Sequence, residues 1–185
     1  MSDTERVSTR AALRRDLERL RATKTRPKPW FVIEALLFDN GFQAVVLYRL
    51  SHAVRRRGIP VIGPLLGRLG VFLTSAEIAP GATFGPGLLI SHGQAIVVGQ
   101  WTVVGRDCHL HQGVTLGAKD VGRIDAMPRV GDGVVIGAGA KIIGGVTLGD
   151  GALVGPNAFV VADVPAGGKA LAPFAEIRPP KAAET

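Results

Sequence analysis

Cysteine and aromatic residues are scarce in this chain of 185 residues. Cys108 is the single cysteine, and aromatic residues make up 5% of the sequence. One cysteine excludes an internal disulfide and is compatible with a reducing compartment. Low aromatic content suits a thin, tightly stacked solenoid better than a globular sandwich. Because Cys108 falls where the repeat described below places small inward residues, we expect a buried structural thiol.

Long hydrophobic runs are also lacking. The best candidate, residues 59–73, is interrupted by prolines, glycines and Arg68, so it is too short and too broken to span a bilayer. The arginines near the start of the chain are not followed by an apolar segment, so no signal peptide is apparent. These absences favour a cytoplasmic protein.

Acidic residues are outnumbered, but only in the first third of the chain. Residues 1–76 hold fourteen Lys or Arg against six Asp or Glu, whereas residues 77–185 hold eight against nine, within a total net charge of +7. No recognised nucleic-acid-binding motif accompanies the basic residues, so we expect a solvated helical surface and no nucleic-acid partner. Contact of this basic region with an anionic membrane surface or a phosphorylated substrate remains open.

Glycine is abundant, with 25 residues, and aliphatic side chains recur every six residues. A fixed short period of this kind indicates a parallel β-helix. Small residues two places before these positions should fill the space beside them. The inward positions are Ile78, Phe84, Ile90, Val98, Val104, Leu110, Leu116, Val130, Ile136, Ile142, Leu148, Val154 and Val160. The preceding small positions include Val134, Ala140, Val146, Ala152 and Ala158.

Before this repeat the periodicity is helical. Apolar spacing predicts helices over residues 3–23, 30–38, 42–57 and 62–74, with a break at residues 39–41. We therefore divide the chain into a helical, basic region (residues 1–76), a β-helix (residues 77–170) and a tail (residues 171–185). The expected fold class is mainly β, a parallel β-helix preceded by helices.

The repeat slips at two places. Ile90 and Val98 are eight residues apart instead of six, so the β-helix must bulge at residues 91–95, and bulges often lie beside active sites. His92 in this bulge is the first functional candidate. Between Leu116 and Val130 there are fourteen residues where twelve would keep the phase, and the polar segment 118–128 should leave the β-helix as a loop that collects binding groups.

At these residues the chain resembles the serine acetyltransferase family of left-handed parallel β-helix acyltransferases. The resemblance covers about residues 26–170. It rests on Glu-Ile-Ala-Pro-Gly-Ala at 77–82, Ile-Ser-His-Gly at 90–93, Ile-Val-Val-Gly at 96–99, Gln-Gly-Val-Thr-Leu-Gly at 112–117 and Val-Ile-Gly-Ala-Gly-Ala-Lys-Ile at 135–142. It implies three hexapeptides per coil, a homotrimer or dimer of trimers, and acetyl-CoA bound between neighbouring coils.

The resemblance also implies roles for individual residues. His92 matches the family's general base, and Glu77 matches the acidic residue that orients it. One coil of eighteen residues beyond Glu77 is residue 95, so the two should stack closely, and a carboxylate would fix the imidazole tautomer. Gly117, Ala118 and Ala138 match contacts to the acetyl-CoA, where small residues leave room for the pantetheine arm.

Departures from the family concern the acceptor. Ser91 stands where serine acetyltransferases have aspartate before the catalytic histidine. Ala126 and Met127 replace an Arg-His pair, and Arg26 aligns with a further aspartate. Groups that would hold an amino acid are thus absent. The isoleucine that docks cysteine synthase is absent too, so no complex with that enzyme is expected.

This pattern looks like the colanic-acid type of exopolysaccharide O-acetyltransferase. We therefore expect transfer of acetyl from acetyl-CoA to a hydroxyl of a sugar or other small metabolite, with serine O-acetylation as the alternative. From another class, a non-catalytic scaffold or a metal-binding trimer is the alternative. His109 and His111 flank inward Leu110 and should both face outward, but no third histidine stands at the expected spacing, so we expect no metal.

Overall fold

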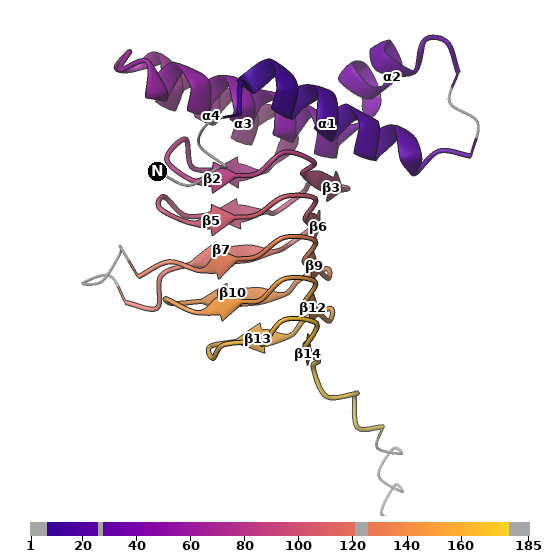
Figure 1. Ribbon diagram of the computed structural model, residues 1–185, viewed down its shortest axis with the longest axis vertical. Coiled ribbons are helices and arrows are strands. Elements are labelled where there is room, and N and C mark those ends of the chain that lie inside the picture. Colours follow the sequence, from indigo (N-terminus) through magenta and orange to yellow (C-terminus); the bar gives the residue numbers. More distant parts are fainter. Residues whose placement is uncertain (1–6, 26–27, 121–125, 178–185) are drawn as a thin grey trace, which may run out of the picture.

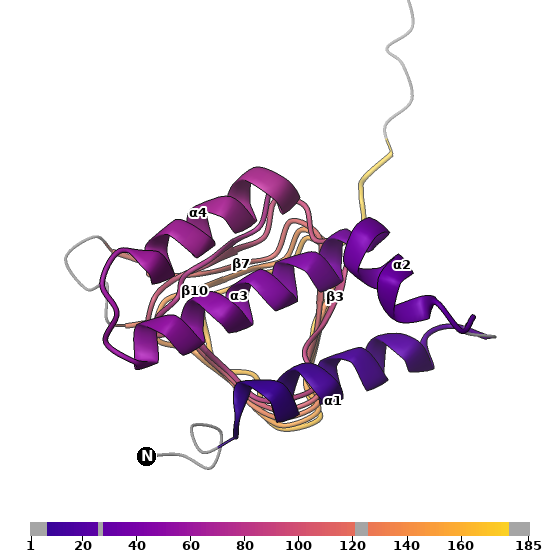
Figure 2. The ribbon, with the colours of Figure 1, turned by 90° about the horizontal axis from the view of Figure 1, so that it is seen from above.

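The protein is a triangular β-helix capped at one end by helices (Figures 1 and 2). Our computed structural model describes residues 7–25, 28–120 and 126–177. The helices are α1 (Thr9–Ala22), α2 (Phe31–Phe38), α3 (Asn40–Arg56) and α4 (Ile62–Thr74). They lie across the end of the β-helix where the first coil begins, and the remaining coils extend away from them.

Within the described residues, fourteen short strands form three parallel sheets, one for each side of the triangle. The first sheet holds β1 (Glu77–Ile78), β4 (Val97–Val98), β7 (Thr115–Gly117), β10 (Lys141–Ile143) and β13 (Phe159–Val160). The second sheet holds β2 (Thr83–Phe84), β5 (Val103–Val104), β8 (Arg129–Val130) and β11 (Thr147–Leu148). The third sheet holds β3 (Leu89–Ser91), β6 (His109–His111), β9 (Val135–Ile136), β12 (Leu153–Val154) and β14 (Lys169–Ala170). The expected β-helix is confirmed.

The interior is built from the repeat positions. All thirteen inward residues predicted from the sequence are buried, and the small residues two places before them are buried as well. Cys108 is 1% exposed, and burial raises the pKa of its thiol to about 11. The thiolate is therefore disfavoured, and the prediction of a buried structural cysteine is confirmed.

The helices follow the sequence prediction with two differences at their starts. The first helix begins at Thr9 and not at residue 3, because the Ser8 hydroxyl accepts a hydrogen bond from the Ala11 N–H and caps the helix there. Residues 1–6 lie outside the described chain. The break before α3 is shorter than expected, because the Asp39 carboxylate caps the Phe42 N–H at 2.9 Å and the helix already begins at Asn40. At this junction α2 and α3 are bent by 85°.

No single helix in the described residues is both long and apolar enough to cross a membrane. The pair of α2 and α3 meets those requirements only when taken together, across its bend.

A buried ion pair joins the helices to the first coil. Asp16 of α1 is fully buried and accepts hydrogen bonds from the Arg49 guanidinium of α3 at 2.9 and 3.1 Å. The same guanidinium donates to the carbonyl oxygens of residues 84–85 at 2.8 and 2.7 Å, and the N–H groups of residues 87–88 donate to Asp16 at 2.8 Å. The pair therefore fixes α1, α3 and the first coil to one another.

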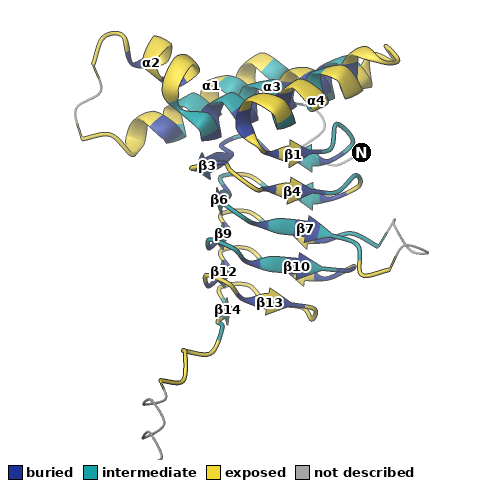
Figure 3. Ribbon diagram, turned by 180° about the vertical axis from the view of Figure 1, so that it is seen from behind, coloured by how far each residue is buried: buried dark blue, intermediate teal, exposed yellow. Residues whose placement is uncertain are grey.

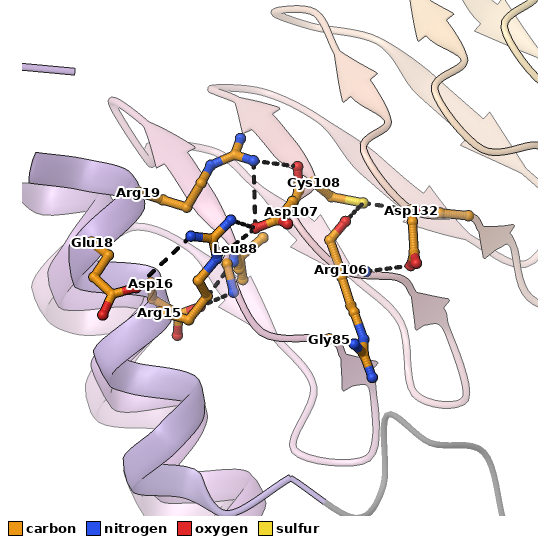
Figure 4. Close-up of polar contacts among 12 residues, drawn as sticks. Arg15, Asp16, Glu18, Arg19, Gly85, Leu88, Arg106, Asp107, Cys108 and Asp132 are labelled. Carbon is orange, nitrogen blue, oxygen red and sulfur yellow. Dashed lines mark hydrogen bonds and ion pairs between the residues drawn. The ribbon is translucent and has the colours of Figure 1, made fainter. Parts of the chain in front are cut away.

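Surface contacts extend this attachment to the second coil. Figure 4 shows Arg15 and Arg19 of α1 reaching Asp107, which lies in the turn before β6. The Arg15 Nε donates to the Asp107 carboxylate at 3.0 Å, and the Arg19 Nη1 donates to the Asp107 carbonyl oxygen at 2.9 Å. These groups are partly exposed, so we expect them to add less stability than the buried pair.

Replacing Asp16 tests the role of the buried pair. The variant Asp16→Asn should lower the free energy of unfolding by about 3–5 kcal/mol, because the buried Arg49 guanidinium loses its counter-charge. Urea denaturation followed by circular dichroism measures this. Glu18→Gln, which removes the exposed ion pairs of Glu18 with Arg14 and Arg15, is the control and should leave the midpoint almost unchanged. An Asp16→Asn midpoint equal to that of the control would show that the pair does not hold the cap.

Candidate active site

His92 lies where the third sheet turns back toward the first. It follows β3 directly, its side chain is exposed, and its backbone adopts φ +69°, as does that of Ala95 at +56°. Ile90 pairs with Leu110, twenty residues on, so the two extra residues of the first slip are accommodated at this corner. Left-handed backbone at a non-glycine residue is strained and clusters at functional sites. The predicted bulge at residues 91–95 is confirmed.

The start of α3 covers this bulge closely. A side chain at Gly41 would clash with the carbonyl oxygen of Ile90, and one at Gly93, where φ is +79°, would lie 2.9 Å from the Asn40 Oδ1. Glycine at both positions therefore lets the helix sit directly on the strand end. The Asn40 Oδ1 is buried and has no hydrogen-bond partner among the described residues.

A cavity of about 370 Å³ opens beside His92. Its walls come from the end of α1, the junction of α2 and α3, and the bulge. The lining residues are Leu20, Thr23, Lys24, Phe38, Asp39, Asn40, Gly41, Leu89, Ile90, Ser91, His92 and Gln94. Lys24, Asp39 and Asn40 were not singled out by the sequence analysis, because only the folded cap brings them to the bulge.

A larger cavity, of about 730 Å³, lies elsewhere, between the start of α1 and the end of α3. Arg10, Arg56 and Arg57 line it, and none of the bulge residues does. The smaller cavity, which His92 lines, is therefore the candidate active site.

Ser91, which adjoins His92, contacts a pair of histidines on the outer face of the third sheet. The Ser91 Oγ lies 2.8 Å from the His109 Nε2, and the His109 and His111 rings are 4.3 Å apart. Burial, followed by the charge of His111, lowers the pKa of His109 to about 4, and burial with the charge of His92 lowers the pKa of His111. His109 is therefore neutral near pH 7.

The two histidines of β6 face outward, as predicted. Each is partly exposed on either side of buried Leu110. Among the residues that the structure describes, no three His, Cys, Asp or Glu side chains are grouped so that they could hold a metal ion.

Glu77 lies beside the bulge in the backbone ladder. Its N–H donates to the Ile96 carbonyl oxygen at 2.8 Å, and the Ala95 N–H donates to the Ser75 carbonyl oxygen at 2.9 Å. The predicted stacking of this segment on the bulge is thus confirmed for the backbone. The Glu77 side chain is exposed, and no hydrogen bond or ion pair within the described chain joins it to His92, so the orienting role stays a prediction.

The predicted acetyl-CoA contacts lie on two corners of the β-helix. Ala138 follows β9 at the same corner as His92. Backbone hydrogen bonds connect the coils at this corner: the Gly113 N–H donates to the Gln94 carbonyl oxygen at 2.8 Å, and the Gly139 N–H donates to the Gln112 carbonyl oxygen at 2.9 Å. Gly117 ends β7 at the other corner of the first sheet, where the chain turns toward the second sheet, and Ala118 follows it. One chain therefore does not bring all three residues together.

Met127 also lies away from His92. It packs against Gly99, where an added Cβ would come within 2.7 Å of the Met127 Cε, and Gly99 follows β4 at the same corner as Gly117. Of the other acceptor-site predictions, Ser91 adjoins His92 in the cavity, and Arg26 lies outside the described residues.

The loop that carries Met127 is larger than the sequence count suggested. Leu116 pairs with Ile142, twenty-six residues on, and the next strand after β7 is β8 in the adjacent sheet. Leu116 and Val130 are therefore on consecutive sides of the triangle, and the fourteen-residue interval holds the usual six residues plus eight extra ones. The sequence count had instead assumed two sides of six residues and two extra residues. The error arose because the spacing alone does not show how many corners the segment turns.

Comparisons with known proteins agree with this geometry. Residues 127–162 match the family described as "Bacterial transferase hexapeptide (six repeats)". The chain is 41% identical to a serine acetyltransferase of Helicobacter pylori over 77% of this chain and 84% of the relative. It is also 41% identical to a serine acetyltransferase of Synechococcus elongatus over 63% of this chain, but spans only 48% of that longer protein.

Solved structures extend the similarity to the helical cap. Soybean serine acetyltransferase complexed with serine superimposes with a TM-score of 0.82 at 34% identity, over 90% of this chain and 68% of the other. The Brucella abortus enzyme in complex with coenzyme A gives a TM-score of 0.80 at 28% identity, over 89% and 65%. Sequence and fold together place the chain in the serine acetyltransferase family.

Proposed function

We propose that the chain is an acetyl-CoA-dependent O-acetyltransferase whose acceptor is a neutral hydroxylated molecule, such as the sugar expected for the colanic-acid type. The observation that carries this proposal is the position of His92: an exposed imidazole on a strained bulge, in a cavity that uncharged Ser91 also lines, with neutral His109 at hydrogen-bond distance from Ser91. Membership of the serine acetyltransferase family supports the donor and the reaction.

His92 acts as general base in the proposed mechanism. Its imidazole takes the proton of the acceptor hydroxyl while the oxygen attacks the thioester carbonyl carbon. The carbon–sulfur bond then breaks, and the imidazolium returns the proton to the departing CoA thiolate. The products are the acetyl ester and free CoA, with no acyl-enzyme intermediate. General-base help contributes about 10² to 10⁴ in rate, and positioning of the two substrates adds to it.

The acceptor assignment follows from the charges beside His92. Ser91 offers a hydroxyl, and neutral His109 lies at hydrogen-bond distance from it. These groups suit a polyol or sugar. Asp39 is the one carboxylate among the described residues that line the cavity, and it already accepts a hydrogen bond from the Phe42 N–H. Burying a charge that stays unpaired costs several kcal/mol.

L-Serine is the second candidate, and one observation favours it. Lys24 and Asp39 line the same cavity and supply one charge of each sign for a zwitterion. Asp39 is partly committed, however, because its carboxylate caps α3 through the Phe42 N–H. The names of the relatives also favour serine.

We also propose that the active unit is a homotrimer or a dimer of trimers. His92 and Met127 lie on different corners of one chain, so a neighbouring copy is required for the loop residue to approach a catalytic base. The end of the chain, on which the expected absence of a cysteine synthase complex rests, lies outside the described residues.

Substitution of the base tests the mechanism. His92→Ala should lower kcat/KM for acetyl transfer at least about 100-fold, because proton removal in the transition state is lost. Glu77→Gln should give a smaller loss, since Glu77 is assigned only an orienting role. CoA release measured with a thiol reagent reports both, and unchanged affinity for CoA shows that the fold survives. Near-parental turnover of His92→Ala would overturn the mechanism.

A panel of acceptors decides between the two candidates. We expect kcat/KM for sugars or nucleotide sugars to exceed that for L-serine, because the wall at Ser91 carries no charge. Lys24→Ala should leave KM for the best neutral acceptor within about twofold, since a neutral molecule has no carboxylate for Lys24 to hold. L-Serine at the top of the panel, with a KM that rises in Lys24→Ala, would establish the second candidate instead.

The neutral state of His109 can be tested by titration. Burial lowers the pKa of His109 to about 4, below its unfolded value of about 6.5. Protonation in that window therefore favours the unfolded chain, so this residue should reduce stability as the pH falls from about 6.5 toward 4. Nitrogen-15 NMR measures the ring titration, with His109→Asn assigning the signal. A titration midpoint near the unfolded pKa would contradict the assignment of a neutral His109.

A further inference from the structure

Helix α2 exposes apolar side chains on most of its surface. Phe31 and Ala35 are buried, whereas Trp30, Ile33, Leu37 and Phe38 are exposed, Phe38 by 80%. Figure 3 shows the helix largely exposed at the margin of the cap. A soluble surface rarely leaves so many large apolar side chains together without a partner, and such patches mark interaction sites.

Cations accompany this apolar helix. Arg21, Lys24 and Lys28 are exposed in the segment that leads into α2, and the Lys28 Nζ lies 5.7 Å from the centroid of the Trp30 ring. From residue 19 to residue 38 the sequence contains a single acidic residue, Glu34. A tryptophan and lysines beside an exposed apolar helix are the combination found where helices lie in the headgroup region of a membrane.

The exposed surface of α4 has a different character. Its exposed residues Ile62, Leu65, Leu69 and Phe72 follow a spacing of three and four, which is typical of packing between helices. Within α4 the single cation is Arg68. Exposed arginines at residues 55–57 precede α4 as well, so α2 is distinguished by Trp30 beside Lys28 and by its place at the cavity of His92.

The α2 helix adjoins the candidate active site. Phe38 at its end, together with Lys24 and Asp39, lines the cavity of His92. Figures 1 and 2 both place α2 at the corner of the cap near β3, the strand that ends at the bulge. A surface bound to α2 would thus lie beside the mouth of the cavity.

We propose that α2 docks on the surface of an anionic phospholipid bilayer. The side chains of Trp30, Ile33 and Leu37 enter the boundary between headgroups and acyl chains, while Lys24 and Lys28 contact headgroup phosphates. With eight residues the helix lies on the membrane and does not cross it. Docking places the cavity of His92 at the bilayer, which suits an acceptor hydroxyl carried by a membrane-anchored glycolipid; this last consequence rests on the proposed function, whereas the docking does not.

Binding to vesicles tests the proposal on the full chain. Trp101→Phe leaves Trp30 as the only tryptophan, so its fluorescence reports docking. Vesicles of equal parts phosphatidylglycerol and phosphatidylcholine should shift the Trp30 emission to shorter wavelength and sediment the protein, and added salt should weaken both effects. Vesicles of phosphatidylcholine alone should bind at least about tenfold more weakly.

Paired variants separate α2 from the rest of the cap. Ile33→Glu with Leu37→Glu should lower binding to the anionic vesicles at least about tenfold, because two apolar anchors become charged. The matched control, Leu65→Glu with Leu69→Glu on α4, should stay within about twofold of the parent. His92→Ala should bind vesicles like the parent although it lacks activity, so failure of the docking and failure of the proposed function are distinguishable.

Three results would overturn the docking. The parent could fail to bind anionic vesicles, or the α2 variant could bind as well as the parent. Light scattering could also show that the α2 variant changes the number of subunits while the α4 variant does not, which would assign α2 to an interface between copies of this chain.

Discussion

The fold depends on one geometric constraint, the stacking of each coil on the coil before it. Inward side chains meet their equivalents only if each side of the triangle uses six residues, and the parallel ladders from β1 to β13 keep that register. Extra residues do not fit in the packed interior, so they are accommodated at the corners between strands. Both places where the repeat slips accordingly lie at corners, and the first presents His92 on strained backbone to the solvent.

The bulge alone does not form a binding site, because a cavity also requires residues that enclose it. The buried pair of Asp16 and Arg49 holds the helices against the first coil, and the start of α3 then covers the bulge. That arrangement brings Lys24, Asp39 and Asn40 from the helical region to an imidazole that belongs to the β-helix. The cap is thus part of the candidate site, and its apolar helix α2 adjoins the same cavity.

The sequence shows the inward pattern directly, because aliphatic residues recur every six positions except at two places. The core positions and the bulge at His92 were therefore predictable. Three features were not. The polar groups of the cap reach the site only through tertiary packing, which no local period encodes. The distance of Met127 from His92 depends on which corner the loop leaves, and spacing does not show this. The backbone partner of Glu77 is Val97 and not residue 95, because the bulge adds two residues to the coil, and the orienting contact of its side chain stays a prediction.

The position of bound CoA tests most directly whether the slip in the repeat created the active site. A crystal structure of the assembled protein with CoA and an acceptor should place the acceptor hydroxyl within about 3–4 Å of the His92 imidazole, with the CoA sulfur beside that hydroxyl. Ala138, at the same corner, should lie along the pantetheine arm. CoA bound with its thiol far from every copy of His92, at a different corner of the β-helix, would contradict the assignment.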